Sequence, residues 1–436
     1  MITASTLPPV KFAFANNETR LDKLKGLQEL GPYGPLGKAP RFGFVFPNEH
    51  KDYANRLYLA LKNGIGYFKG IETLFRVKLE KHQVFPVTGF SIAQEKTSGD
   101  AARSYADAII SWSHQQEKEQ PDLFFIIHPQ TPHAEIDTPY YACKALLLEH
   151  GLLSQSVTFQ LLENRSQFEW AAANIALGAF AKIGGIPWIV SSTGNEQGLV
   201  IGLGRAHLYD PLTRQTTRYL AFTSCFSARG LFKFIALADV AYSRQEYLSI
   251  LTNVVTSSME RAEQTSSQVN NLTIHVPKEM GREENEAIRR AVETHNKGRV
   301  LQIQVVKVTE EESFFAVDQR YQDGIPKRGT VLRVSDQDYI LYTEGRDEKE
   351  TWRARVPTAL RVTPQRGTTG SHQQLLRQIQ DLSQVNWRGF NARSQPISLY
   401  YGNLIARILS HVAPERIIGL YSDKARPVIQ DRMWFL

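Results

Sequence analysis

Residues 123–127 read Leu-Phe-Phe-Ile-Ile, a continuous apolar run. Such a run is typical of a parallel strand that helices cover on both faces. A helix is predicted next over 139–150, then a strand over 156–162 and a helix over 168–182. Because strands alternate here with helices of ordinary length, this part of the chain is predicted to form a parallel, Rossmann-like sheet.

The sequence before this run extends the same pattern. Residues 42–46 predict another buried strand, and helices are expected over 50–66 and 101–118. The first forty residues include the run Gly-Pro-Tyr-Gly-Pro-Leu-Gly, turn chemistry that excludes a long helix or a central strand. We therefore expect residues 1–40 to be an irregular lead-in packed on the C-terminal domain, and residues 41–190 to form the first folded domain.

The order of elements changes after this domain. The predicted elements are strands at 187–191, 199–208, 217–226 and 232–238, a helix at 244–267, a strand at 272–276, a helix at 281–297, a strand at 299–308, short strands within 328–362 and helices at 371–385 and 397–411. Several strands in a row, then alternating elements, then C-terminal helices are typical of a mixed sheet of the ribonuclease H type. The predicted fold class is α/β, with a second domain over 191–436.

Composition narrows the class of protein. The chain has 436 residues, which suggests two or three domains, and no apolar run is long enough for a membrane span. The N-terminus lacks the features of a secretory signal. The cysteines, Cys143 and Cys225, are too few for a disulfide framework or a thiolate metal site and fit a reducing cytoplasm. A formal net charge of +7 and a pI of about 9.2 favour anionic partners, nucleic acid first.

The predicted helix at 139–150 carries the first candidate binding residues. Thr138 is a good N-cap and Pro139 suits the first helical position, which places Tyr140 and Lys144 on one face of the first turns. A helix N-terminus presents free N–H groups and the positive end of the helix dipole, so a phenol and an ammonium beside it would bind an anion. Taken alone, an exposed Tyr–Lys pair is more often a solvated helix face.

Three further features favour a binding site. Gln155 offers an amide side chain where the next strand begins, and Lys182 ends the following helix, eight residues after Asn174. The chain ends in Trp-Phe-Leu at 434–436, and apolar terminal residues are expected to be buried, which would fix the terminal carboxylate. A carboxylate next to a phosphate needs a cation between them, and Mg²⁺ suits that role through its oxygen ligands.

This set of residues resembles the Argonaute family. The order Tyr-x-x-x-Lys, Ser-Gln and Lys-x-Gly-Gly-x-Pro-Trp is similar to the 5′-phosphate pocket of its MID domain, and the run Asn-Trp-Arg-Gly-Phe at 386–390 is similar to its PIWI domain. The resemblance covers nearly the whole chain and is most specific over 138–188 and 384–436. It implies a MID domain over 41–190 and a ribonuclease H-like PIWI domain over 191–436. The chain is too short for the N and PAZ domains, as in short prokaryotic Argonautes.

The resemblance implies a role for each pocket residue. Tyr140 would stack on the first guide base and touch its phosphate, and Leu436 would hold Mg²⁺ through the terminal carboxylate together with that phosphate. The other implied phosphate ligands are Lys144, Gln155, Lys182 and, as a lesser contact, Asn174. Ser154 is the alternative to Gln155 if the family spacing shifts by one residue. Candidate contacts to the nucleic-acid backbone are Arg205, Arg388 and Arg393.

The ligands for metal-dependent cleavage are missing from the expected positions. A ribonuclease H-type nuclease holds two Mg²⁺ ions with three or four acidic or histidine ligands. The resemblance to active Argonautes implies that Gly204 stands at the first aspartate position, Pro277 or a neighbour at the second, and Asn403 at the position of the last ligand, often histidine. Asp210 and Glu279 lie close to two of these positions, and a shifted alignment could recruit one of them, but we do not expect it to recruit a complete set. We therefore expect a catalytically inactive PIWI domain.

Three functions remain open from the sequence. The first is guided binding without cleavage, with a 5′-phosphorylated guide (RNA by family expectation) and a single-stranded target (DNA by the same expectation). Short Argonautes of this kind work with an APAZ-containing protein that carries a TIR, Sir2 or nuclease effector, so the resemblance implies a cytoplasmic defence sensor against plasmids or phage. The second is an active guide-directed nuclease. The third is a nucleotide-binding α/β enzyme, although Gly202-Leu203-Gly204 lacks the third glycine of a Rossmann fingerprint.

Overall fold

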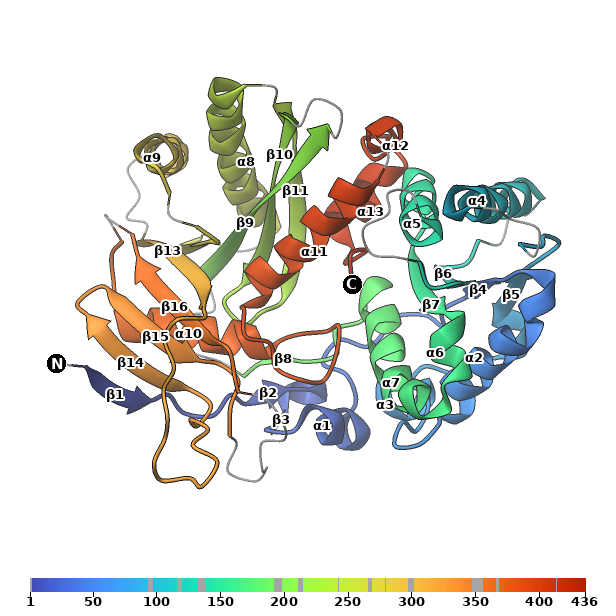
Figure 1. Ribbon diagram of the computed structural model, residues 1–436, viewed down its shortest axis with the longest axis horizontal. Helices are drawn as coiled ribbons and strands as arrows, with labels where there is room; N and C mark the ends of the chain where they lie inside the picture. The colour runs from blue at the N-terminus through green and yellow to red at the C-terminus, as the bar shows by residue number, and fades with distance from the viewer. Residues whose placement is uncertain are drawn as a thin grey trace. The chain divides into compact units, whose positions relative to one another are not determined.

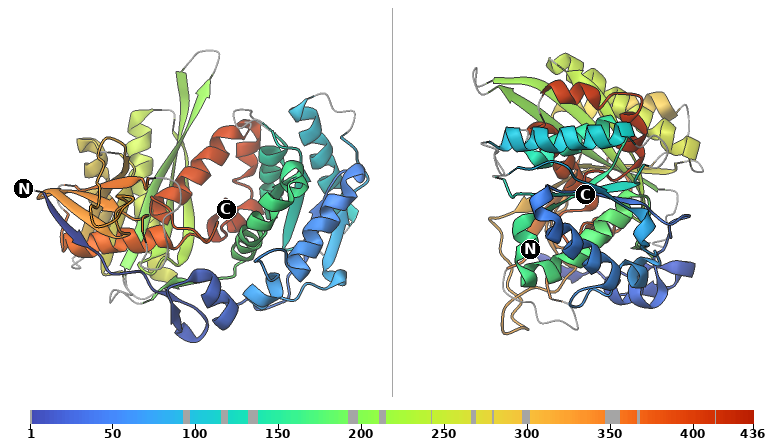
Figure 2. Two further views of the ribbon diagram at one scale, coloured as in Figure 1. Left: turned by 60° about the horizontal axis from the view of Figure 1, so that its bottom comes forward. Right: turned by 90° about the vertical axis from the view of Figure 1, so that its right-hand side faces the viewer.

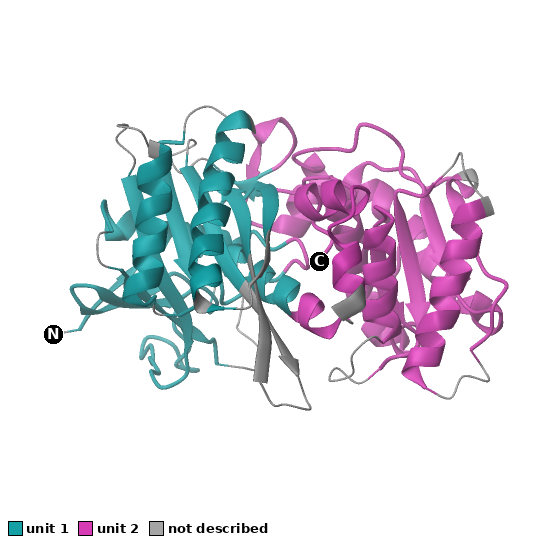
Figure 3. Cartoon of the chain, turned by 90° about the horizontal axis from the view of Figure 1, so that it is seen from above, with its two compact units in different colours: residues 1–13, 189–386, 391–406 teal, residues 14–188, 387–390, 407–436 magenta. Residues whose placement is uncertain are grey.

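The chain forms two compact units, each assembled from several segments (Figure 3). Unit 1 comprises residues 1–13, 189–386 and 391–406, and unit 2 comprises residues 14–188, 387–390 and 407–436. The computed structural model describes residues 2–92, 97–115, 120–131, 138–191, 198–210, 215–241, 243–265, 269–278, 280–296, 302–346, 356–365, 368–412 and 414–436. The boundary expected at residue 40 differs from these units, because only residues 1–13 fold with unit 1 and residues 14–40 fold with unit 2. The C-terminal domain expected over 191–436 is also divided, because residues 387–390 and 407–436 fold with unit 2.

Unit 2 is built on a parallel four-stranded sheet (Figure 1). Its strand order is β5 (Val84–Val87), β4 (Phe42–Val45), β6 (Leu123–His128) and β7 (Ser154–Thr158), every pair parallel. Its helices are α1 (Lys23–Leu30), α2 (Lys51–Asn63), α3 (Ile71–Phe75), α4 (Ser98–Gln115), α5 (Pro139–Glu149), α6 (Phe159–Glu163), α7 (Arg165–Lys182), α12 (Pro414–Gly419) and α13 (Ala425–Asp431). The predicted Rossmann-like sheet is therefore confirmed.

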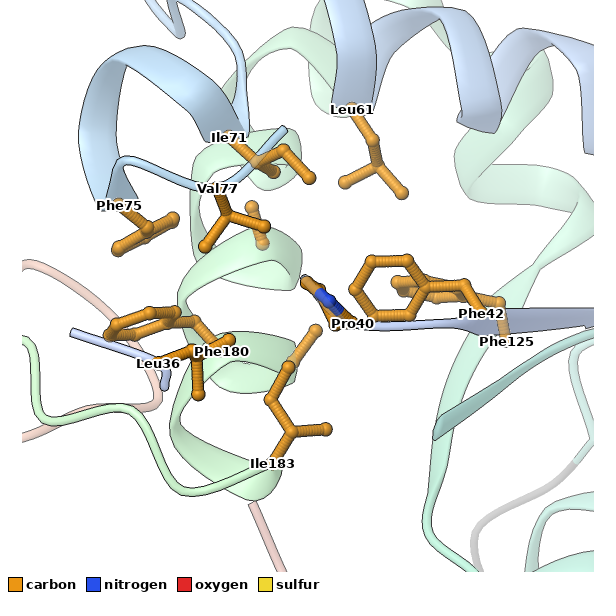
Figure 4. A pocket seen from close by; sticks show the side chains of 12 residues that line it. Leu36, Pro40, Phe42, Leu61, Ile71, Phe75, Val77, Phe125, Phe180 and Ile183 are labelled. Atoms are coloured by element: carbon orange, nitrogen blue, oxygen red, sulfur yellow. The ribbon is translucent and has the colours of Figure 1, made fainter. Parts of the chain in front are cut away.

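The apolar side chains at 123–127 pack on both faces of this sheet. Phe124 and Ile126 pack with Tyr105 of α4 and Leu147 of α5. Phe125 points to the opposite face and, with Phe42, lines a small cavity beneath α2, α3 and α7 (Figure 4). Every residue lining that cavity is apolar, which marks a gap in core packing rather than a ligand site.

Unit 1 is built on a mixed nine-stranded sheet. The strand order is β1 (Thr3–Thr6), β14 (Thr330–Ser335), β15 (Asp338–Tyr342), β16 (Ala359–Pro364), β13 (Gln302–Glu311), β12 (Asn271–Val276), β9 (Gly198–Asp210), β10 (Gln215–Ser227) and β11 (Phe232–Ala241). The central strands β9, β12 and β13 are parallel, and the flanking pairs are antiparallel. This is the predicted mixed sheet, so the α/β fold class is confirmed.

Helices cover both faces of this sheet (Figure 2). Helices α8 (Arg244–Thr265) and α9 (Arg282–Asn296) pack on one face, and α10 (His372–Gln384) and the start of α11 (Ile397–His411) pack on the other. Successive residues of a strand face opposite sides of the sheet. On β9, the Ile201 side chain packs with residues of α8, and Gly202 faces the backbone of α11. Within the described residues, no helix combines the length and the hydropathy of a membrane span.

The first forty residues are more regular than expected. They contain β1, β2 (Phe12–Ala13), β3 (Thr19–Arg20) and α1. Asp22 caps α1 by accepting the backbone N–H of Lys25 at 2.9 Å, a signal that was present in the sequence. The strand predicted over 156–162 ends earlier, at Thr158, because the Thr158 side chain caps α6 instead.

Candidate functional site

Most of the predicted phosphate ligands converge in unit 2. The Lys182 ammonium donates to Gln155 Oε1 at 2.8 Å and to the Ser154 carbonyl at 2.7 Å. The Lys144 ammonium donates to the Trp434 carbonyl at 2.6 Å and lies 5.6 Å from the centre of the Tyr140 ring. Helix α5, strand β7, the end of α7 and the C-terminal tail thus meet at one pocket.

The apolar sequences of helices α5 and α7 explain why Lys144 and Lys182 are buried. Helix α5 is buried on nearly every side, with Ala142, Cys143 and Leu147 in the core, so that Lys144 is only 2% exposed. Helix α7 is buried over its last three turns, and Lys182 is 1% exposed. The alternative of a solvated helix face is therefore wrong for Lys144.

Burial shifts the pKa of three groups of the pocket. Burial lowers the pKa of Lys144 to about 7, and the positive charge of Arg388 acts in the same direction. Burial also holds the pKa of Lys182 well below its usual range, with the charges of Lys144 and Arg388 adding to the effect. The pKa of Tyr140 is raised to about 12 by burial, although Arg388 opposes the change. The Tyr140 phenol therefore remains a proton donor at neutral pH.

The pocket has an excess of buried positive charge. In the described part of the chain, the partners of Lys144 and Lys182 are carbonyl and amide oxygens, and neither lysine pairs with a carboxylate. Buried charge without a counter-charge is unfavourable. A bound anion would supply that counter-charge, and two ammonium groups beside a phenol are donors that suit a phosphate.

The C-terminal tail is buried, as predicted. Trp434 and Phe435 are each 1% exposed and Leu436 is 7% exposed. The Trp434 indole donates to the Ile429 carbonyl at 3.1 Å, and the Leu436 N–H donates to the Met433 carbonyl at 3.2 Å. The terminal carboxylate is thereby fixed two residues from the carbonyl that Lys144 binds.

The chemistry of the pocket suits Mg²⁺ only with help from a ligand. The Leu436 carboxylate and Gln155 Oε1 are hard oxygen donors of the kind that Mg²⁺ prefers. Among the described residues no group of three or more His, Cys, Asp and Glu side chains could hold a metal ion. A metal at the tail would therefore share its coordination with the bound phosphate and water.

A short segment from the C-terminal half adds an arginine to the pocket. Residues 387–390 fold with unit 2, where the Trp387 indole donates to the Trp188 carbonyl at 3.0 Å. Asn174 lies against this segment, because a Cβ on Gly389 would be 3.2 Å from Asn174 Oδ1. Arg388 is exposed, and its charge acts on Tyr140 and on both buried lysines.

Another arginine at the pocket was missed by sequence reasoning. The charge of Arg407, near the end of α11, acts on Tyr140 and Tyr141. No local signal identifies Arg407, since its place beside Tyr140 depends on folding across more than 250 residues. The two other arginine candidates do not join the pocket: Arg393 lies in unit 1, 5.0 Å from the Tyr400 ring, and the side chain of Arg205 lies outside the described residues.

The three positions of the expected nuclease centre lie in unit 1. Gly204 is on β9, Pro277 follows β12, and Asn403 is on α11, where its amide donates to Gln395 Oε1 at 2.9 Å. A Cβ on Gly204 would lie 2.2 Å from atoms of the Phe222 ring. Glu279 and the side chain of Asp210 lie outside the described residues.

The surroundings of Gly204 are mostly apolar. Gly204, Phe222 and Pro277 line one cavity together with Leu203, Tyr247, Leu251, Val254, Val276, Lys278 and Met280. On the neighbouring strand, His275 is fully buried with Nδ1 2.7 Å from Ser398 Oγ, and burial lowers its pKa to about 3. His275 is thus a neutral, packed histidine.

The two units together define an α/β protein in which a ribonuclease H-like sheet accompanies a Rossmann-like MID unit. Residues 127–413 match the Piwi domain family, and the chain belongs to that family. A "Piwi protein" of Archaeoglobus fulgidus is 23% identical over 440 residues, which cover 95% of this chain and 93% of that protein. A "Protein argonaute" of Cereibacter sphaeroides is 21% identical over 453 residues, which cover 93% of this chain and 56% of that protein.

Solved structures show the same fold. Clostridium butyricum Argonaute, bound to a guide DNA and a 19-mer target DNA, superposes with a TM-score of 0.70 at 18% identity. Drosophila Piwi superposes with a TM-score of 0.69 at 12% identity. The matches cover 94% and 99% of this chain, but only 53% and 56% of those proteins. The chain spans about half the length of these solved relatives.

Proposed function

We propose that the protein anchors the 5′ phosphate of a guide nucleic acid in unit 2 and uses the guide to bind a complementary target without cutting it. The observation that carries this proposal is the pair of buried lysines, Lys144 and Lys182, which lack a carboxylate partner in the described part of the chain. Such a pair costs stability in the free protein, and a phosphate removes that cost.

Each residue of the pocket has a distinct part in holding the guide. Two ammonium groups have six N–H bonds, and three of these are used within the protein. The remaining three N–H bonds could donate to a ligand with several acceptor oxygens, such as a terminal phosphate. Tyr140 supplies a phenol donor and a ring for base stacking, and Arg388 adds a positive charge at the rim.

Mg²⁺ is proposed as the ion that joins the guide phosphate to the terminal carboxylate of Leu436. When bound, it would neutralise two negatively charged groups that otherwise repel each other. The buried Trp434 and Phe435 hold that carboxylate in place before any ligand arrives. Asn174 and Gln155 orient the surrounding groups.

The proposal that the target is not cut rests on unit 1. Metal-dependent cleavage requires carboxylates that hold two ions close together. Gly204, Pro277 and Asn403 offer no negative charge, and the Phe222 ring occupies the space into which a side chain at 204 would extend. The residues that line the cavity next to Gly204 and Pro277 are mostly apolar and include Lys278 but no carboxylate, a lining that does not favour metal ions.

The guide, target and partner are assigned by resemblance. An RNA guide and a single-stranded DNA target are proposed, with an APAZ-containing partner that carries a TIR, Sir2 or nuclease effector in the cytoplasm. Target binding would activate this effector in defence against plasmids or phage. The partner is assigned from the resemblance to short Argonautes, and the chain matches only about half the length of solved Argonautes.

Binding and cleavage assays test the two halves of the proposal. The purified chain is expected to bind a 5′-phosphorylated guide at least tenfold more tightly than the same guide with a 5′ hydroxyl. A matched target is expected to stay intact in the presence of Mg²⁺ or Mn²⁺. Equal binding of the two guides would refute the pocket, and a cut opposite the middle of the guide would establish an active nuclease instead.

A further inference from the structure

Lys23, the first residue of α1, is a buried lysine that lies outside the phosphate pocket. It is 7% exposed. Its ammonium donates to the Phe390 carbonyl at 3.0 Å and lies 5.7 Å from the centre of the Trp188 ring. Lysines are seldom buried unless they are paired, because removing an ammonium from water is unfavourable. The burial of this lysine, which binds a carbonyl 367 residues away in the sequence, therefore needs an explanation.

Helix α1 holds Lys23 in place through its own packing. Asp22 caps the helix by accepting the backbone N–H of Lys25. A Cβ on Gly26 would lie 2.2 Å from the Phe14 ring, so only glycine lets the helix approach that ring so closely. The first turn of α1 is thus fixed by contacts within unit 2, and the backbone of Lys23 is fixed with it.

The segment that Lys23 binds, from Trp387 to Phe390, carries the exposed arginine of the phosphate pocket. At one end of this segment, the Trp387 indole donates to the Trp188 carbonyl. At the other end, the Phe390 ring centre lies 5.6 Å from the Trp188 ring centre, and the Phe390 carbonyl accepts from Lys23. Arg388 lies between these two attachments, and its positive charge acts on both buried lysines of the pocket. The two attachments therefore set where the backbone of Arg388 lies.

We propose that Lys23 is a positioning residue for the guide phosphate: it holds the segment from Trp387 to Phe390 so that the Arg388 guanidinium stays at the rim of the pocket. This inference rests on the proposed function, because it takes a 5′ phosphate as the anion that Arg388 attracts. An arginine on an anchored backbone loses less conformational freedom on binding than one on a free loop. Lys23 therefore strengthens phosphate binding through Arg388, without touching the ligand itself.

An ammonium suits this role better than an apolar side chain does. A charged donor forms a stronger hydrogen bond to a carbonyl than a neutral donor does, and the face of a tryptophan ring attracts a cation. The fully buried Trp188 joins both ends of the segment, since its carbonyl binds Trp387 and its ring contacts Phe390 and Lys23. Removing the ammonium is expected to loosen the Phe390 end and to leave the Trp387 end attached.

Lys23→Met tests this role, because methionine keeps the apolar stem but removes the donor. The measured quantity is the ratio of the affinities for a 5′-phosphorylated guide and for the same guide with a 5′ hydroxyl. We expect this ratio to fall about three- to fivefold, the contribution of one partly exposed ion pair. Arg388→Gln should lower the ratio by at least as much, and adding Lys23→Met to Arg388→Gln should lower it by less than about twofold more. Lys25→Met, at an exposed lysine of the same helix, is the matched control and should leave the ratio unchanged.

A lysine that only packs would give a different result, since its loss would lower Tm or weaken the binding of both guides equally. An unchanged ratio in Lys23→Met, or a fall as large in the Arg388→Gln background as in the wild-type background, would overturn this inference alone. Equal binding of the two guides by the wild-type chain would refute the proposed function as well. If Lys23→Met does not fold, Lys23→Gln, whose neutral side chain is shorter, should also lower the ratio; an unchanged ratio in that variant would refute the role of Lys23.

Discussion

Replacing Lys144 with methionine should stabilise the free protein and weaken its binding of the 5′ phosphate of a guide. The pKa of Lys144 falls from an ordinary 10.5 to about 7 on folding. At about 1.4 kcal/mol per unit, the buried ammonium costs the free protein on the order of 4 kcal/mol near pH 7. Lys144→Met removes this cost but forfeits the hydrogen bond to the Trp434 carbonyl. The net gain expected is about 1–3 kcal/mol, a rise of several degrees in Tm.

The same substitution should lower the preference for a 5′-phosphorylated guide by about 10- to 150-fold, which corresponds to the loss of hydrogen bonds from a charged donor. Thermal unfolding of the free chain and equilibrium binding of phosphate and hydroxyl guides measure the two effects. Lys78→Met, at an exposed lysine of unit 2, is the matched control and should change neither. A Lys144→Met variant that unfolds at a lower temperature and still discriminates between the guides would show that the lysine is structural, and would refute the reasoning.

Three other predictions concern Lys144, the C-terminal tail and Gly204. Stability of the free protein should rise with pH between about 7 and 10.5, because the unfolded chain holds the Lys144 proton that the folded chain releases; affinity for a 5′-phosphorylated guide should fall over that interval, and both trends should be weaker, but not absent, in Lys144→Met, because burial also lowers the pKa of Lys182. Adding residues after Leu436 should weaken guide binding at least tenfold, since the buried tail must leave the pocket; an extended chain that binds normally would contradict the role of the terminal carboxylate. Gly204→Asp should destabilise unit 1 by about 1–3 kcal/mol without creating cleavage, because its Cβ would overlap the Phe222 ring; a Tm equal to that of the wild type would show that the ring is free to move.

Much of the fold could be predicted because, in most segments, the spacing of apolar residues and the length of the segment indicate the same type of element, helix or strand. The central elements, such as the run at 123–127 and the helix at 397–411, lie where the sequence places them. The strand predicted over 156–162 was too long because a capping threonine in its middle was read as a β-branched strand residue. Helix α1 was missed because neighbouring Gly and Pro residues obscured the capping signal of Asp22.

The candidate site was predictable only where its residues lie close in the chain or match a family motif. Tyr140 and Lys144 follow from one helix, but the buried state of Lys144 depends on packing around the whole of α5. Arg407 and the Phe222 ring gave no local signal. Arg407 lies near Tyr140 only because α11, a helix far away in the sequence, ends close to α5. Phe222 covers Gly204 because these two residues are paired in the register of β9 and β10. Register and tertiary contact are properties that a local pattern does not contain.

Packing stabilises the site around Gly204, whereas buried charge destabilises the site around Lys144, and this difference supports the different functions proposed for the two sites. Around Gly204, a ring and apolar side chains fill the space, so the site gains stability from its own packing. Around Lys144, two buried ammonium groups leave the site short of negative charge. Groups that reduce the stability of the free protein are useful when a ligand restores it, since the binding free energy then includes the relief of that cost. The buried positive charge that lacks a counter-charge thus lies at the pocket proposed for the guide phosphate in unit 2, whereas Gly204 and Phe222 carry no charge.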